Sequence, residues 1–97
     1  MITFEVFING GKACVAGVDG LGVLTAILSS VHRAPNAEAD EDASRPIQEL
    51  TFEVGGLRSA EGVHVSWLER PLAVGDVLII NIKDLAVVDE PTASAPA

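Results

Sequence analysis

The chain has 97 residues, of which 48% are hydrophobic, and 14 acidic against 6 basic residues give it a formal net charge of -8 at pH 7. This length and composition predict one globular domain rather than a disordered chain or two separate cores. The negative charge disfavours phosphate backbones and anionic lipids, because the basic residues are scattered singly along the chain. We therefore expect a protein partner, favoured if its surface is basic, and neither nucleic acid nor a membrane.

The residue types that carry most enzyme and metal chemistry are scarce. Cys14 is the single cysteine, so it forms neither an internal disulfide nor a thiolate metal site, and we expect it in the core. Two histidines, His32 and His64, do not occur at metal-ligand spacing. These counts predict a protein that is not an enzyme, with no catalytic residues, no metal and no cofactor. The N-terminus lacks the pattern of a signal peptide, which predicts a cytoplasmic location.

The first 18 residues have the pattern of a β-hairpin. Apolar and polar side chains alternate over residues 2–9, the period of a half-buried strand. Asn9 and Gly10 follow, and both residue types tolerate the positive φ of tight hairpin turns. A second strand is predicted over residues 12–18.

The next segment favours a helix. Apolar residues recur at intervals of three and four, the spacing of one helix face: Leu21, Leu24, Leu28 and Val31. Asp19 can cap the first turn, and Pro35 follows the last. The pattern predicts one helix over residues 21–33.

The remaining pattern indicates an acidic segment, three strands and a tail. Residues 36–45 are rich in Asp and Glu and predict a mobile acidic loop. Strands are expected over 50–54, 63–68 and 77–83, and the last reads as a central strand covered on both faces because it is almost wholly apolar. The ordered domain is expected to span 1–88, followed by a disordered tail over 89–97.

These elements together predict an α+β fold. We expect a β-grasp-like roll, in which a mixed sheet of about five strands carries one helix packed on one face. An open α+β roll is the alternative, since element order alone does not fix the strand order.

The candidate binding residues cluster in and after a glycine-rich loop over 55–62. This loop holds Arg58, Ser59 and Glu61, and the strand that follows carries His64 and Trp67. Loops held by rigid strands are where binding residues concentrate. A wide hairpin turn with a surface ion pair explains the same residues without a ligand.

Two function hypotheses follow from this reading. The first is a small, non-enzymatic protein–protein interaction module or accessory subunit, with exposed strand edges open to β-addition and to a homo-oligomer. The alternative is a small-molecule or anion-binding domain that uses the 55–62 loop.

Several short stretches resemble a family of small, uncharacterised bacterial proteins. In the front half they are Phe7-Ile8-Asn9-Gly10, Cys14-Val15-Ala16-Gly17 and residues 22–28. In the back half they are Val54-Gly55-Gly56-Leu57, then Ser59, Gly62, His64 and Trp67, then Leu72-x-Val74-Gly75-Asp76. The resemblance covers most of the chain outside the acidic segment and the tail, and it implies no particular activity.

A second resemblance concerns the segment before the last apolar strand. Residues 71–76, Pro-Leu-Ala-Val-Gly-Asp, are similar to the last turn of β-grasp sulfur carriers. Those carriers end in Gly-Gly, whereas this sequence ends in Ser94-Ala95-Pro96-Ala97. The resemblance therefore implies a β-grasp-like fold without the carrier chemistry.

Overall fold

The structure, a computed structural model, describes residues 1–34 and 47–97. The acidic segment predicted over 36–45 lies outside the described residues. Seven strands make up the secondary structure: β1 (Ile2–Ile8), β2 (Gly11–Gly17), β3 (Gly22–Arg33), β4 (Ile47–Arg58), β5 (Val63–Pro71), β6 (Leu78–Asp84) and β7 (Ala93–Pro96). Within the described ranges there is no helix, and hence none long and apolar enough to cross a membrane.

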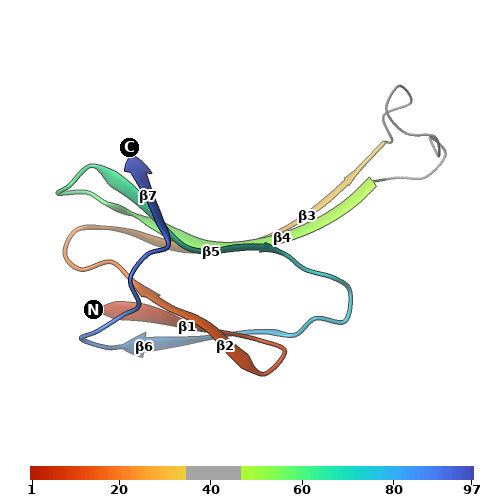
Figure 1. The fold of residues 1–97 in the computed structure, drawn as a ribbon, viewed down its shortest axis with the longest axis horizontal. Coiled ribbons are helices and arrows are strands. Elements are labelled where there is room, and N and C mark those ends of the chain that lie inside the picture. The colour runs from red at the N-terminus through yellow and green to blue at the C-terminus, as the bar shows by residue number, and fades with distance from the viewer. Residues whose placement is uncertain (35–46) are drawn as a thin grey trace.

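The strands form two antiparallel sheets packed face to face. One sheet has the order β2-β1-β6 and the other the order β3-β4-β5-β7. Figure 1 shows them as two layers, with β2 lying against β5 on one side of the molecule. The predicted α+β fold is therefore wrong: in the described part of the chain the protein is all-β, and no helix covers either sheet as a β-grasp-like roll requires.

The segment predicted to be a helix over 21–33 is instead strand β3. It pairs with β4 residue for residue, from Gly22 opposite Arg58 to Arg33 opposite Ile47. Two of the four apolar residues that fit a helical spacing also fit alternation, since even-numbered Leu24 and Leu28 share one face. β-branched residues stand at four odd-numbered positions and favour a strand: Val23, Thr25, Ile27 and Val31.

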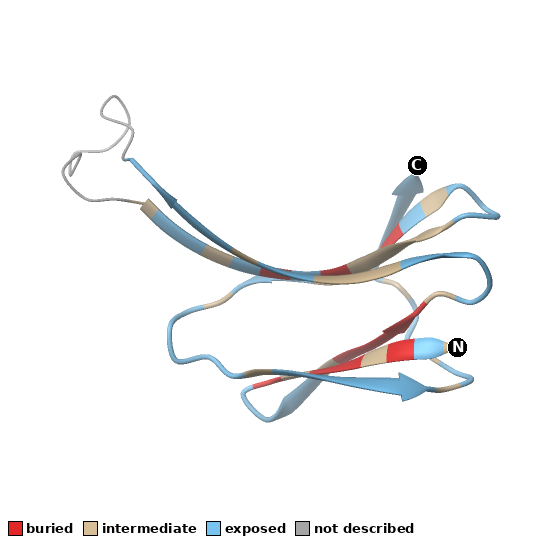
Figure 2. Cartoon of the chain, turned by 180° about the vertical axis from the view of Figure 1, so that it is seen from behind, coloured by how far each residue is buried: buried red, intermediate tan, exposed pale blue. Residues whose placement is uncertain are grey.

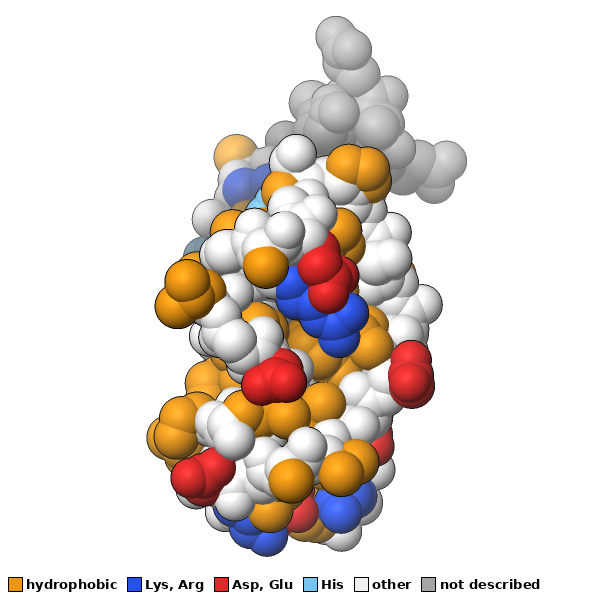
Figure 3. All heavy atoms as spheres, turned by 90° about the vertical axis from the view of Figure 1, so that its left-hand side faces the viewer, with side chains coloured by type: hydrophobic (Ala, Val, Ile, Leu, Met, Phe, Trp, Pro, Cys, Tyr) orange, Lys and Arg blue, Asp and Glu red, His pale blue; other side chains and the backbone are white. Residues whose placement is uncertain are grey.

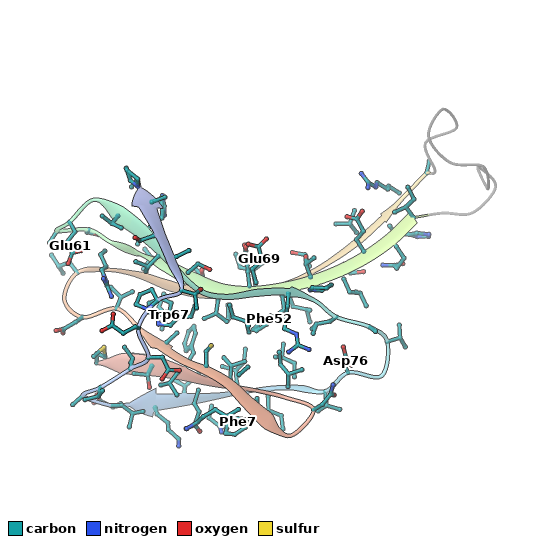
Figure 4. The ribbon with its side chains drawn as sticks, in the orientation of Figure 1. Phe7, Phe52, Glu61, Trp67, Glu69 and Asp76 are labelled. Carbon is teal, nitrogen blue, oxygen red and sulfur yellow. The ribbon has the colours of Figure 1, made fainter. Side chains whose placement is uncertain are left out.

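Buried side chains from both sheets meet in one core. Its members come from β1, β2, β4 and β5: Val6, Ile8, Cys14, Ala16, Phe52, Val54, Val65 and Trp67. Figure 4 shows Phe52 and Trp67 pointing from the upper sheet toward the lower one. The expectation that Cys14 belongs to the core is confirmed, since 4% of it is exposed.

The predicted β1–β2 hairpin is confirmed. Asn9 and Gly10 form its turn with φ of 52° and 82°, the left-handed conformation that a two-residue hairpin favours. The Asn9 side chain also accepts a hydrogen bond from the Val77 N–H (2.8 Å) and donates one to the Asp76 carboxylate (3.1 Å). The turn is thereby tied to the connection that leads into β6.

The chain after β6 closes one side of the two-layer structure. We call residues 85–92 the strap. Asp89 in the strap exchanges hydrogen bonds with Val15 on β2, through its N–H (2.9 Å) and its carboxylate (2.8 Å), and its carbonyl accepts from the Trp67 indole N–H on β5 (2.8 Å). The expected disordered tail over 89–97 is thus wrong, because these residues hold β2 and β5 together and then form β7 beside β5.

One charged side chain is nearly buried on the outer face of the three-stranded sheet. Glu5 is 8% exposed, and its carboxylate lies 3.0 Å from the Lys83 ammonium on β6 and 3.5 Å from that of Lys12 on β2. The hydrogen bond from Lys83 lowers the pKa of Glu5 below its ordinary value, against a smaller opposing effect of burial. Glu5 thus links all three strands of this sheet through one charge.

We predict that Glu5→Gln lowers the free energy of unfolding at pH 7. A carboxyl group whose folded pKa is lowered stabilises the fold above its unfolded pKa, and the stabilisation is lost as pH falls through the folded pKa. The difference in melting temperature between wild type and variant should therefore close as pH falls below about 4. Circular dichroism melts over this range test it, with the exposed Glu61→Gln as control; a gap that stays constant with pH would contradict the assignment.

Candidate functional site

The prediction of a loop over 55–62 is only partly right: residues 55–58 belong to strand β4, where they pair with β5, and residues 59–62 form the turn between the two strands. Gly62 has φ of 63°, and its N–H donates to the Ser59 carbonyl (3.3 Å) to close the turn. The Ser59 N–H donates to the Leu21 carbonyl (3.1 Å), which fastens the turn to the chain entering β3. The guanidinium of Arg58 lies 4.0 Å from the Glu61 carboxylate, and most of the Glu61 side chain is exposed.

The five predicted binding residues do not converge on one site. Arg58, Ser59 and Glu61 lie in or beside the turn, whereas Trp67 points into the core with its indole bonded to the strap. His64 lies on the opposite face of β5 from Trp67, lining a cavity on the outer side of the sheet. Figure 4 shows Glu61 at the turn and Trp67 between the sheets.

The end of the molecule that carries this turn has no concentration of one charge. Figure 3 views this end and shows acidic and basic side chains lying among neutral and hydrophobic ones. The Arg58–Glu61 pair is an exposed contact at the outer limit for an ion pair, a kind that contributes little to stability. The loop therefore has the geometry of a hairpin turn with a surface ion pair.

We predict that Arg58→Ala changes the free energy of unfolding by about 0.5 kcal/mol or less, because a partly exposed side chain with one distant partner stabilises little. Chemical denaturation followed by Trp67 fluorescence measures this change. Glu61→Ala is the matched control and should behave alike. A loss above about 2 kcal/mol in Arg58→Ala alone would show that the guanidinium has a structural role.

The buried thiol of Cys14 is held in its protonated form. Burial, with a smaller contribution from the charge of Asp89, raises the pKa of Cys14 to about 11. The thiolate is the nucleophilic form of cysteine, so this environment disfavours reactivity at neutral pH. Cys14 thus serves packing between the sheets.

The outer face of the four-stranded sheet is concave and holds a cavity of about 440 Å³. Its polar lining comes from Thr25 on β3, from His64 and Ser66 on β5, and from the carboxylates Glu53 and Glu69. Glu53 and Glu69 stand directly opposite each other on β4 and β5. Like charges opposite each other destabilise a sheet, and their shared field favours a cation rather than an anion.

The sequence did not single out Glu53 and Glu69 as a pair. They are 16 positions apart in the chain, and only the β4–β5 register, with its irregularity between Val54 and Gly55, brings them opposite each other. Within residues 1–34 and 47–97, no three His, Cys, Asp or Glu side chains are grouped to hold a metal ion.

The side of the molecule away from the strap is open. There β3 and β6 are the last strands of their sheets, and among the described strands each is paired along one edge only. A groove of about 480 Å³ runs between them, lined by Phe4, Leu24, Thr25, Ala26, Ile27, Ile80 and Ile82. We call this surface, made of β3, β6 and the groove, the open edge.

Large apolar side chains remain exposed along the open edge. Ile80 and Ile82 are opposite the core-facing Val6 and Phe4 in the register of β1 and β6, so they share the inner face of the sheet. Ile82 is nevertheless 72% exposed, and Leu28 on β3 is 59% exposed. Figure 2 views the molecule from behind Figure 1 and shows β6 exposed along most of its length, in front of the buried part of β1. The core of the protein is thus uncovered on this side.

The prediction that residues 77–83 form a central, covered strand is wrong in its second part. The segment is strand β6, but it stands at the edge of its sheet. Its sequence, Leu78-Ile79-Ile80-Asn81-Ile82, is nevertheless that of a strand covered on both faces. The open edge therefore contains a strand whose sequence is typical of a sheet interior but whose position is exposed.

Comparison with protein-family models, with curated proteins and with solved structures gave no match to this chain. The resemblance to small bacterial proteins therefore stays a prediction.

Proposed function

We propose that the chain is a small cytoplasmic, non-enzymatic protein–protein interaction module or accessory subunit, and that it binds its partner along the open edge. The exposure of β6 carries this proposal: a strand with the composition of a sheet interior lies at an edge with Ile82 72% exposed. Exposed apolar patches next to free strand edges are typical of binding surfaces.

The open edge offers two kinds of interaction to a partner. The backbone N–H and C=O groups along the edges of β3 and β6 that no described strand pairs can bind an added strand, which supplies affinity without requiring particular side chains. The groove between them accepts apolar side chains against Phe4, Leu24 and Ile80, which supplies selectivity. Burying exposed Ile and Leu side chains is worth about 1.5–3 kcal/mol each at full burial.

We predict that Ile82→Lys weakens partner binding at least about tenfold without unfolding the protein. Ile82 is largely exposed, so lysine is tolerated in the free chain but places a charge against the apolar part of a partner. Tagged full-length chain is incubated with lysate of the source cells, and co-isolated proteins are quantified by mass spectrometry, with circular dichroism checking the fold.

The control for this experiment is Val74→Lys. Val74 is 94% exposed and lies in the connection between β5 and β6, outside the open edge. We expect the specific partners to fall at least about tenfold with Ile82→Lys, a loss of about 1.4 kcal/mol, and to persist with Val74→Lys. Equal recovery with wild type and with both variants would rule out the open edge as the binding surface.

A second candidate function is supported by the carboxylate pair on the concave face. The cavity of about 440 Å³ between Glu53, Glu69 and Ser66 is of ligand size, and it would take a cationic group, such as an amine or a lysine side chain of a basic partner. No lysine or arginine is among the described residues that line the cavity, so it favours a cation over an anion. The ligand would then be either a small cationic molecule or a basic side chain of a protein partner.

For this candidate we predict that a lysine-rich peptide shifts the amide NMR signals of Gly55, Gly56 and Ser66. The shifts should disappear in the double variant Glu53→Gln with Glu69→Gln and weaken as salt screens the charges. Glu61→Gln with Glu49→Gln, which removes two exposed carboxylates elsewhere, is the matched control. Unchanged signals in the wild type would exclude a cation site on this face.

A further inference from the structure

We propose that a second copy of this chain covers the open edge, in a two-fold dimer that continues both sheets across the axis. The proposal rests on the assignment of binding to the open edge and names its occupant. In this dimer β3 pairs antiparallel with its copy, and the two β6 strands come side by side in the other layer.

The first argument is the placement of the two edges. β3 ends one sheet and β6 ends the other, and one groove is lined by both, so the two free edges lie on the same side of the molecule. A two-fold axis perpendicular to the layers brings each edge to its own copy at once. Such an isologous contact joins the two four-stranded sheets to each other and the two three-stranded sheets to each other. It also buries the exposed, inward-facing side chains of Leu28 and Ile82 in one continuous core.

The second argument is the distribution of charge. Next to a two-fold axis a residue meets its own copy, so a charge in the middle of the strand would meet a like charge. Residues 22–32 of β3 contain no charged residue in a chain of net charge -8, and Arg33 stands at the end of the strand. The strand thus lacks the Lys, Asp, Glu or Pro with which an unpaired edge is usually protected.

The third argument is the extent of the surface. β3 supplies 12 residues and β6 supplies 7. Together they approach the roughly 20 residues per partner of a standard interface. The opposite side of the molecule needs no such cover, because the strap already bonds to β2 through Asp89 and to β5 through Trp67.

The net charge gives this dimer a distinctive salt dependence. Two copies of charge -8 repel each other at long range, while the β3 part of the contact, residues 22–32, contains no charged residue. Added salt screens the repulsion, so the dimer should tighten with salt. A complex with a basic partner would weaken instead, because its attraction is screened.

The experiment is sedimentation velocity on the purified full chain, over a range of concentrations and at about 0.05 M and about 0.5 M NaCl. We expect a species of twice the 10.1 kDa chain mass that dissociates on dilution and is favoured by the higher salt. Leu28→Lys sets two lysines, one from each copy, close to the axis and should raise the dimer dissociation constant at least about a hundredfold. Val74→Lys adds the same charge elsewhere and should leave it within about threefold.

The outcomes separate this proposal from the proposed function. A mass of 10.1 kDa at every concentration and salt overturns the dimer, and the function stands if Ile82→Lys still loses partners from lysate. A dimer that persists in a folded Leu28→Lys variant also overturns it, because the contact then lies elsewhere. If the wild type is monomeric and Ile82→Lys loses nothing, both proposals fail.

Discussion

Both sheets are stabilised by one set of side chains packed between them, and the rest of the structure depends on this contact. The three-stranded sheet contributes Val6, Ile8, Cys14 and Ala16, and the four-stranded sheet contributes Phe52, Val54, Val65 and Trp67. Each sheet has one apolar face, and that face is removed from water only by the other sheet. The strap completes this contact on one side, whereas on the other side the apolar layer continues to the surface at the open edge.

Local chemistry made part of this fold predictable from the sequence. The β1–β2 hairpin follows from Asn9 and Gly10, because their positive φ is a property of the turn itself. The helix predicted over 21–33 is wrong because the spacing of Leu24 and Leu28 fits both a helix and a strand, and pairing with β4 decides between them. That pairing joins residues up to 36 positions apart, which no local pattern reveals. β7 is similar, since a tail of Ala, Ser and Pro becomes a strand through its contact with β5.

The surface was predictable to a lesser degree. The loop predicted over 55–62 is a turn only over 59–62, because residues 55–58 continue strand β4. The residues around the turn face different parts of the molecule: Trp67 the core, His64 the concave face. The sequence predicts that some strand edges are exposed. It does not predict which strands carry them, because the position of a strand in its sheet is set by the strand order. The apolar sequence of β6 is the most informative signal in the chain. It indicates the open edge only in combination with the position of β6 at the end of its sheet.

The pairing of β1 with β6 has a consequence for how the protein is made. Ile2 lies opposite Asp84 and Ile8 opposite Leu78, so one ladder joins residues up to 82 positions apart. The hairpins β1–β2, β3–β4 and β4–β5 involve strands that follow each other in the sequence, but the three-stranded sheet is complete only when the chain up to Asp84 has left the ribosome. Folds dominated by such distant pairing form slowly, within milliseconds to seconds. Until then the edge of β1 that pairs with β6 is open, and the nascent chain can be bound by chaperones or by other nascent chains translated from the same messenger RNA.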